Sequence, residues 1–298
     1  MKKKWYQIKE YSAGTKRLIF TWHVYKLLGR KPVEWIARII GFVTFILHSS
    51  IRKYSKIYFE TLYKYTDNKQ FKPGFINSLK HTQSYALSLV DKMEVYANTK
   101  DFHLTFDDYE LKQDLSRGGV FFIITHTGNI ELMRNLMMKK DHKKINIFMQ
   151  KSHCEKFNNF INSLSQTTDI TVYPVEEIGV ETALDIKSKL SEGEVVLMAG
   201  DRLSAQNTNK CYDAKLLGRK VKLPLGTLKF ALMMDAPIYL LACLKNDDGS
   251  FRIISEKFSK DESRSDNLNN LQKQFVNYLE KITLSAPYQF YNFYDFFE

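Results

Sequence analysis

Cysteine is scarce in this sequence, and its pattern argues against two kinds of site. The three cysteines, Cys154, Cys211 and Cys243, are scattered over a chain of 298 residues and are odd in number. No CxxC pair and no Cys/His spacing typical of a zinc site connects them. We therefore expect three reduced thiols, without a disulfide framework and without a metal centre.

The sequence also lacks internal repeats, low-complexity segments and an apolar run long enough to cross a bilayer. Its most apolar segment, WIARIIGFVTFIL at residues 35–47, is shorter than the roughly 20 residues that a span requires, and it contains Arg38. The segment begins too late for a signal peptide and has no small-residue cleavage site. We expect a helix that lies in or dips into a membrane interface. A single N-terminal span and a buried core helix with a basic edge are the alternatives.

Acidic residues are rare in the first fifth of the chain. Residues 1–64 contain 14 of the 44 Lys and Arg but 3 of the 33 Asp and Glu, a net charge of +11, so residues 65–298 hold 30 of each and are neutral. The apolar segment is flanked on both sides by basic residues, namely Lys26, Arg30, Lys31, Arg52, Lys53 and Lys56. This pairing suits an anionic membrane, where each basic side chain near the surface contributes about 1 kcal/mol. Residues 65–298, which have no net charge, contain no recognisable motif for nucleic-acid binding, and this disfavours a nucleic-acid-binding protein.

From residue 75 onward the pattern predicts an α/β domain, preceded by basic amphipathic helices within residues 1–74. Residues 75–97 read as a long amphipathic helix, and short apolar runs then alternate with helical patterns. We predict strands at 120–125, 145–149, 170–175, 194–200, 237–244 and 251–258, and helices at 129–140, 153–165, 180–190, 225–234 and 265–283. The alternation favours a mainly parallel sheet with helices on both faces across residues 75–298. Ligands bind such sheets beyond the carboxyl ends of the strands.

One of these strand ends carries a group of polar residues. The run FFIITHTGNIELM, residues 121–133, leads from a predicted buried strand into His126, and Gly128 allows a turn. Asn129 is a favourable N-cap for the next helix, and Glu131 falls in its first turn. Residues five apart on one helix differ by about 140°, so His126 and Glu131 can meet only if His126 precedes the helix.

We expect Glu131 to accept a hydrogen bond from one ring nitrogen of His126, which leaves the other nitrogen as a general base. A capping glutamate beside an incidental loop histidine is the alternative interpretation. No GxSxG elbow precedes the pair, so a serine nucleophile is not expected here.

The hexapeptide HTGNIE, residues 126–131, resembles the HxxxxE/D motif of the glycerolipid acyltransferase superfamily, and in particular the lipid A acyltransferases of the lauroyl/myristoyl type. Further segments resemble that family in the same order: IRKYSKIYFETLY (51–63), VVLMAGDR (195–202), the block 216–244 and the aromatic close 286–297. The likeness covers most of the chain and is strongest to a bacterial subgroup associated with glycosyltransferases and with the acylation of pigment or polyene precursors. Ile130 departs from the aromatic residue that lipid A enzymes usually carry, which leaves the acceptor open.

The resemblance implies a membrane-bound O-acyltransferase at the cytoplasmic face of a bacterial inner membrane. His126 would deprotonate a hydroxyl of a lipid or glycolipid acceptor, and Glu131 would orient His126. A fatty or aryl polyene-type acyl chain would come from acyl carrier protein or coenzyme A, without a cofactor. A lysophospholipid or glycerol-phosphate acyltransferase is one alternative, and a non-catalytic module that binds membranes or acyl carrier protein is another.

Several further residues are candidates for substrate contacts. Arg202 would stabilise the oxyanion or hold a phosphate, Asp201 would orient Arg202, and Gly128 and Asn129 complete the expected substrate-binding set. A surface ion pair is the alternative for Asp201 and Arg202. Contacts with an acidic carrier protein or with phosphate are expected from Arg219, Lys220 and Lys222, unless they form a solvated basic loop. Either core packing or an interface patch explains the aromatic residues Phe290, Tyr291, Phe293, Tyr294, Phe296 and Phe297.

Overall fold

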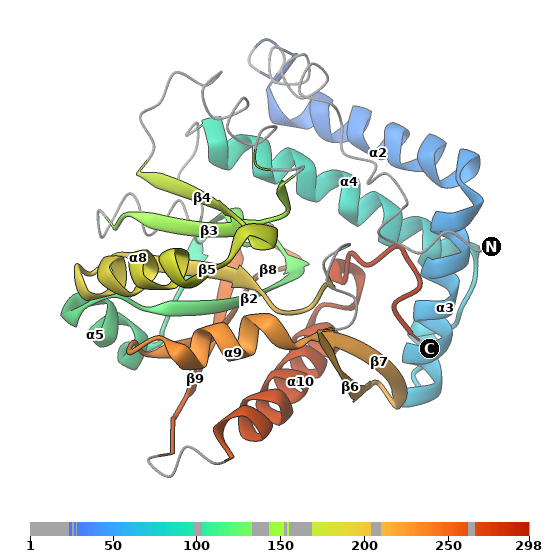
Figure 1. Ribbon diagram of the computed structural model, residues 1–298. Helices are drawn as coiled ribbons and strands as arrows, with labels where there is room; N and C mark the ends of the chain where they lie inside the picture. The colour runs from blue at the N-terminus through green and yellow to red at the C-terminus, as the bar shows by residue number, and fades with distance from the viewer. Residues whose placement is uncertain are drawn as a thin grey trace.

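The structure is a computed structural model that describes residues 24, 25, 27, 29–97, 103–132, 143–151, 154, 169–203, 210–261 and 266–297 (Figure 1). Its main sheet contains β1 (Leu104–Thr105), β2 (Phe121–Gly128), β3 (Ile145–Met149), β4 (Ile170–Pro174), β5 (Val195–Ala199), β8 (Ile238–Lys245) and β9 (Phe251–Phe258). A separate hairpin contains β6 (Cys211–Leu216) and β7 (Arg219–Pro224). The described helices are α2 (Arg30–Leu47), α3 (Ser49–Thr66), α4 (Phe75–Ala97), α5 (Tyr109–Arg117), α8 (Val180–Ser191), α9 (Leu225–Met233) and α10 (Asn267–Ser285).

The seven strands of the main sheet follow the order β1-β9-β8-β2-β5-β3-β4. Strands β8, β2, β5, β3 and β4 run parallel to one another, and β9 pairs antiparallel with β8. The predicted α/β class with a mainly parallel sheet is therefore confirmed. The order also places β2 and β5 side by side in the middle of the sheet, which decides the geometry of the candidate site.

Alternate residues of β2 belong to two different cores, one on each face of the sheet. Phe121 and Ile123 pack in a core that includes buried side chains of α3, α8, α9 and α10. Phe122 and Ile124 lie in a second core with Leu111 of α5. Burying each such side chain contributes about 1.5–3 kcal/mol. The expectation of helices on both faces is confirmed by this division.

Most predicted elements are confirmed within a few residues, and 75–97, 145–149 and 251–258 match α4, β3 and β9 at both ends. Most of the helix predicted at 129–140, and nearly all of the one at 153–165, lies outside the described residues. The three cysteines are free thiols, as expected.

The helices α2 and α3 form the N-terminal part of the described fold, and α2 runs along α4 (Figure 1). The helix α3 contributes Tyr58, Phe59 and Leu62 to the main core. No single helix in the described part of the chain is long and apolar enough to cross a membrane, whereas α2 and α3, bent by 95° at their junction, meet that criterion as a pair. The division at residue 74 into two domains stays a prediction.

The aromatic segment at the C-terminus packs into the fold. Phe290, Tyr291, Phe296 and Phe297 are buried, and three of them belong to the main core. Phe290 stacks on Tyr58 of α3 with ring centroids 5.0 Å apart. Of the two interpretations of these aromatics, core packing is the one that the structure shows for the four buried residues.

Candidate active site

His126 lies on an irregular stretch at the carboxyl end of β2. Ile124 pairs with Leu241 and Gly128 with Cys243, so four steps along β2 match two steps along β8. Such bulges redirect side chains at sheet ends. Gly128 closes the bulge with a φ of 79°, and a Cβ there would lie 2.1 Å from the Cys243 carbonyl oxygen. The predicted turn at Gly128 is therefore confirmed, although the strand extends to Gly128 rather than ending at residue 125.

The neighbouring strand β5 brings Asp201 to His126. Ile124 pairs with Ala199 in parallel register, so moving two residues along each strand places His126 beside Asp201. The His126 backbone N–H donates to Asp201 Oδ2 at 2.8 Å, and His126 Nδ1 lies 2.7 Å from Asp201 Oδ1. Gly200 allows this approach, because a Cβ there would lie 2.8 Å from Ile123 Cγ2. One carboxylate thus holds both the backbone and the ring of the histidine.

The electrostatics of this pair fix which ring nitrogen carries a proton. Burial raises the pKa of the Asp201 carboxyl, but its attraction to His126 whenever that ring is protonated, its hydrogen bonds with His126 and the charge of Arg202 leave that pKa below its usual value. Asp201 is therefore ionised and accepts from both N–H groups, so Nδ1 carries the proton. Among the residues that the structure describes, none is hydrogen-bonded to Nε2, and 40% of the His126 side chain is exposed. Nε2 is left as a basic, accessible nitrogen.

The predicted hydrogen bond between His126 and Glu131 is wrong. Glu131 Oε1 lies 2.8 Å from the ammonium group of Lys92 on α4. The carboxylate that is hydrogen-bonded to His126 Nδ1 belongs to Asp201. The parallel pairing of β2 and β5 places the two residues side by side. A catalytic role for Glu131 stays a prediction, but the hydrogen bond to His126 that would support this role is not formed.

Arg202 holds the C-terminal segment. Its Nη2 donates to the Tyr291 carbonyl at 2.7 Å, its Nε donates to Asn292 Oδ1 at 2.9 Å, and its guanidinium lies 5.9 Å from the centroid of the Tyr294 ring. Both carboxylate oxygens of Asp201 accept from His126, and the charge of Arg202 helps to lower the pKa of Asp201, so the prediction that Asp201 orients Arg202 stays a prediction. Substrate contact by Arg202 stays a prediction.

The C-terminal segment also contacts Thr127, the residue after His126. Thr127 forms an antiparallel bridge with Phe290, and His81 Nε2 lies 2.8 Å from the Phe290 carbonyl oxygen. Burial lowers the pKa of His81 to about 4, so its imidazole is neutral near pH 7. The carbonyl can only accept, so Nε2 carries the proton and Nδ1 accepts from the Ser55 hydroxyl at 3.0 Å. No sequence motif singles out His81, which lies on the amphipathic helix α4.

Asn129 does not cap the following helix with its side chain. Its backbone N–H donates to the Cys243 carbonyl at 2.7 Å, while its amide group is buried and has no hydrogen-bond partner among the described residues. A role for Gly128 and Asn129 in substrate binding stays a prediction. The direct contribution of both residues is to position the strand end that carries His126.

The basic candidates of the 216–244 block lie on β7, away from the pair. Arg219 donates to Thr61 Oγ1 at 3.1 Å and stands 5.6 Å from the centroid of the Phe297 ring. Lys222 forms an ion pair with Asp213 at 2.6 Å. Lys220 is exposed on the same strand. The structure brings none of the three into contact with His126 or Asp201, and binding of a carrier protein or phosphate by them stays a prediction.

Chemically, a histidine held by a buried carboxylate can remove a proton from a hydroxyl group near Nε2. No protein-family model matches this chain, and no curated protein matches it either.

Proposed function

We propose that this protein is a membrane-associated O-acyltransferase in which His126, oriented by Asp201, is the general base. The observation that carries the proposal is the pair of hydrogen bonds that Asp201 accepts from His126. Asp201 Oδ2 lies 2.8 Å from the His126 backbone nitrogen, and Asp201 Oδ1 lies 2.7 Å from His126 Nδ1. This arrangement fixes the tautomer that leaves Nε2 basic. The likeness of residues 126–131 and 195–202 to acyltransferase segments supports acyl transfer as the reaction.

In the proposed reaction, His126 Nε2 takes the proton of an acceptor hydroxyl as that oxygen attacks the carbonyl carbon of an acyl thioester. The tetrahedral intermediate then collapses, the carbon–sulfur bond breaks, and the imidazolium returns the proton to the departing thiolate. Asp201 stabilises the imidazolium while it exists. A positioned general base of this kind contributes about 10²–10⁴-fold in rate.

The proposed donor is a fatty or aryl polyene-type acyl chain on acyl carrier protein or coenzyme A, and the proposed acceptor is a lipid or glycolipid hydroxyl. The basic N-terminal fifth supports a site of action at an anionic membrane. The cytoplasmic face of a bacterial inner membrane follows from the acyltransferase resemblance. A lysophospholipid acceptor would use the same base and the same proton route.

The test is acyl transfer by the purified full chain in lipid vesicles, supplied with an acyl thioester and a bacterial lipid extract. Thiol release and the mass of the acylated lipid are both measured. We expect His126→Ala to slow transfer by about a hundredfold or more. The matched control is His103→Ala, because His103 is an exposed histidine outside the candidate site.

Transfer that persists at the normal rate in folded His126→Ala protein would remove His126 as the base. Absence of transfer by the unaltered protein, combined with binding to acyl carrier protein, would favour the non-catalytic module. The acceptor is identified by comparing the lipids and pigments of a strain that lacks the gene, where one species should lose a single acyl chain.

A further inference from the structure

The helix α2 exposes a broad apolar face to solvent. Its large apolar side chains on this face are between 38% and 71% exposed: Trp35, Ile36, Ile39, Ile40, Phe42, Val43, Ile46 and Leu47. Soluble proteins rarely leave a contiguous apolar surface of this kind uncovered, and such surfaces mark interaction sites.

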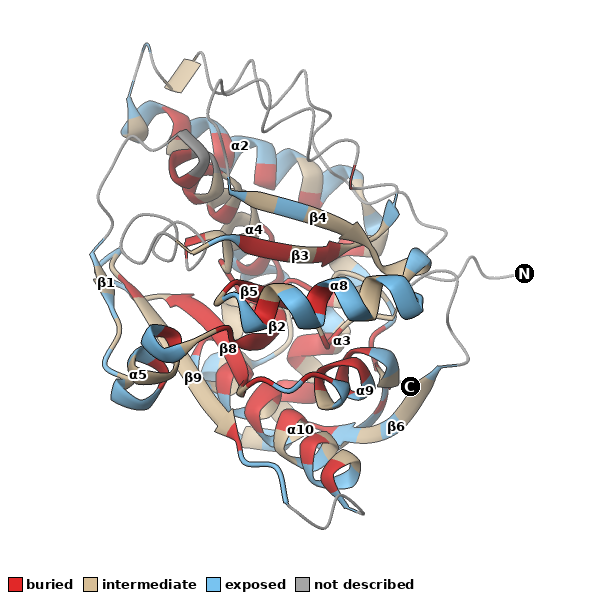
Figure 2. Ribbon diagram, turned by 60° about the vertical axis from the view of Figure 1, so that its left-hand side comes forward, coloured by how far each residue is buried: buried red, intermediate tan, exposed pale blue. Residues whose placement is uncertain are grey.

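The opposite side of α2 packs against α4. Val33, Ala37, Gly41 and Phe45, spaced four residues apart, are buried toward α4. The approach is close, because a Cβ at Gly41 would lie 3.3 Å from the Ala86 Cβ. Figure 2 shows the resulting alternation of buried and exposed residues along α2. The helix therefore presents one side to α4 and the other outward.

The exposed face continues onto the beginning of α4. Phe75 and Ile76 are 56% and 68% exposed, and the Phe75 ring packs edge-on against Phe45 of α2 with centroids 5.1 Å apart. The two helices thus contribute to one surface, which we call the α2–α4 patch: the eight exposed apolar residues of α2 together with Phe75 and Ile76.

Exposed basic residues accompany the patch. Lys31 and Arg38 are exposed on α2 itself, and Lys72 and Lys80 are exposed near the beginning of α4. A second copy of this chain would bring its own basic residues against these, which is unfavourable. Anionic lipid headgroups complement them, and the acyl region beneath the headgroups accommodates the apolar side chains.

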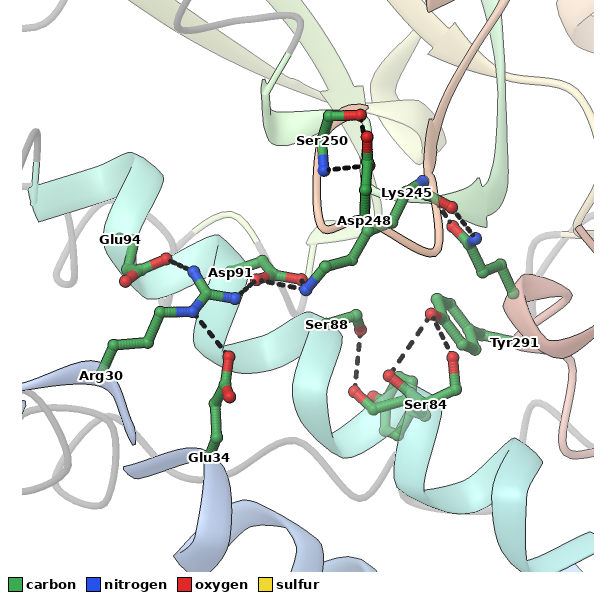
Figure 3. Close-up of polar contacts among 12 residues, drawn as sticks. Arg30, Glu34, Ser84, Ser88, Asp91, Glu94, Lys245, Asp248, Ser250 and Tyr291 are labelled. Atoms are coloured by element: carbon green, nitrogen blue, oxygen red, sulfur yellow. Dashed lines mark hydrogen bonds and ion pairs between the residues drawn. The ribbon is translucent and has the colours of Figure 1, made fainter. Parts of the chain in front are cut away.

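Polar contacts fix α2 in place near both of its ends. At the beginning, Arg30 pairs with Glu94 and, at 2.6 Å, with Asp91, and the ammonium group of Lys245 on β8 lies 2.9 Å from Asp91 (Figure 3). At the other end, the Arg52 side chain donates to the Phe45 carbonyl at 2.6 Å. The orientation of the patch is thereby fixed relative to β8 and to the sheet.

We propose that the α2–α4 patch docks onto an anionic bilayer with α2 lying in the plane of the interface and still packed on α4. The inference extends the membrane association within the proposed function. It is tested by vesicle binding without acyl transfer, so docking and catalysis can each fail separately.

The first experiment measures co-sedimentation of the full chain with vesicles of phosphatidylglycerol and phosphatidylcholine. We expect the double variant Ile39→Ser/Ile46→Ser to bind at least about tenfold more weakly, because two apolar side chains no longer enter the lipid. The control is Val180→Ser/Leu184→Ser, which alters two apolar residues on α8 that are even more exposed than Ile39 and Ile46. Binding should also weaken on vesicles of phosphatidylcholine alone.

Two results of this experiment would overturn the proposal. One is equal binding by the α2 variant and the unaltered protein. The other is a concentration-dependent dimer that the Ile39→Ser/Ile46→Ser change dissociates, since the occupant of the patch would then be a second copy of the chain.

The second experiment measures the depth of α2 with brominated lipids that quench tryptophan fluorescence. Single-tryptophan proteins carry the fluorophore at position 35, 39 or 46, with the other tryptophans replaced by phenylalanine. Positions 35 and 46 lie on the same side of the helix and about 16 Å apart along its axis. Equal depths are expected for a helix in the plane, whereas a depth difference near that spacing would show a crossing helix and contradict the proposal.

Discussion

At the scale of single residues, Gly128 makes the bulge under His126 possible. Its φ of 79° and the Cys243 carbonyl oxygen, 2.1 Å from a hypothetical Cβ, exclude any side chain. We expect Gly128→Ala to lower the free energy of unfolding by more than the roughly 1–2 kcal/mol that a left-handed conformation alone costs. Urea denaturation measures the loss.

Gly249→Ala is the matched control for this prediction. Gly249 has a similar φ of 85° but no heavy atom within 4 Å of its hypothetical Cβ. The loss of stability in Gly249→Ala therefore measures the cost of the positive φ alone, without a steric clash at the Cβ. Equal losses in the two variants would show that the contact with Cys243 does not constrain the strand end.

His81 gives the fold a dependence on pH. Its pKa is lowered by burial to about 4 in the folded protein, against about 6.5 in an unfolded chain. Between these values the unfolded chain binds a proton that the folded one does not, so stability is complete above about pH 6.5 and falls as the pH drops toward 4. The loss amounts to about 3 kcal/mol at most.

Urea denaturation across pH 4–7 measures this dependence. His81→Gln cannot titrate but keeps an amide donor for the Phe290 carbonyl. We expect the variant to lose less stability than the unaltered protein between pH 6.5 and 4. Identical pH profiles would assign the acid sensitivity to other groups.

The pairing of His126 illustrates what a sequence reveals about single residues. The local pattern places His126 and Asp201 each at a strand end, and both positions are confirmed near the carboxyl ends of β2 and β5. Which strands are neighbours is a property of the whole sheet and is absent from either local pattern. Glu131 is the carboxylate near His126 in the sequence, whereas Asp201 is 75 residues away and reaches His126 because β2 and β5 pair in register.

At the scale of elements, the C-terminal segment supports the strand ends that carry the His126–Asp201 pair. Residues 290–292 contact Thr127 on one side and Arg202 on the other. We infer that Arg202 positions this segment. Arg202→Lys removes the Nε donor to Asn292, and we expect it to lower kcat and to leave KM for the acyl donor and acceptor unchanged.

Asn292→Ala removes the same hydrogen bond without altering charge, and it should reproduce the effect on kcat. A rise in KM in Arg202→Lys alone would indicate that Arg202 binds a substrate group directly. Steady-state kinetics on both variants distinguish the two roles.

The helix α5 and the β6–β7 hairpin were not predicted, because their local sequence signals are weak. The helix α5 is mostly polar and buries Leu111 and Leu115. The β6–β7 hairpin turns at Leu217 and Gly218, whose φ values of 49° and 76° are both positive. Leucine is an uncommon residue in that conformation, so the usual hairpin signal of Asn-Gly or Asp-Gly is missing. Long amphipathic patterns and β-branched runs, by contrast, predicted α4, β3 and β9 well.

At the scale of the whole molecule, a charged cluster connects α2 to α4 and β8. Asp91 and Glu94 are almost fully buried and face Arg30, and Asp91 also faces Lys245. Burial lowers the pKa of Arg30, but the charges of Asp91 and Glu94 and the hydrogen bonds to Asp91 and Glu34 outweigh it and leave that pKa raised.

We expect Arg30→Met to reduce the free energy of unfolding by about 3 kcal/mol, because two buried carboxylates lose a partner. Glu34→Gln is the control, because it removes a partly exposed partner of the same arginine at position i+4 and should cost less than about 0.5 kcal/mol. Thermal or urea unfolding measures both. Equal losses would show that the cluster does not hold α2 against α4.

The central claim is that Asp201 orients the catalytic base, and the most direct test compares acyl-transfer rates of Asp201→Asn and Glu131→Gln in folded protein. Asparagine keeps the shape of Asp201 but cannot stabilise the imidazolium. The account predicts a loss of about a hundredfold or more for Asp201→Asn and a much smaller loss for Glu131→Gln, whose observed partner is Lys92. A near-normal rate in Asp201→Asn with a collapse in Glu131→Gln would contradict it.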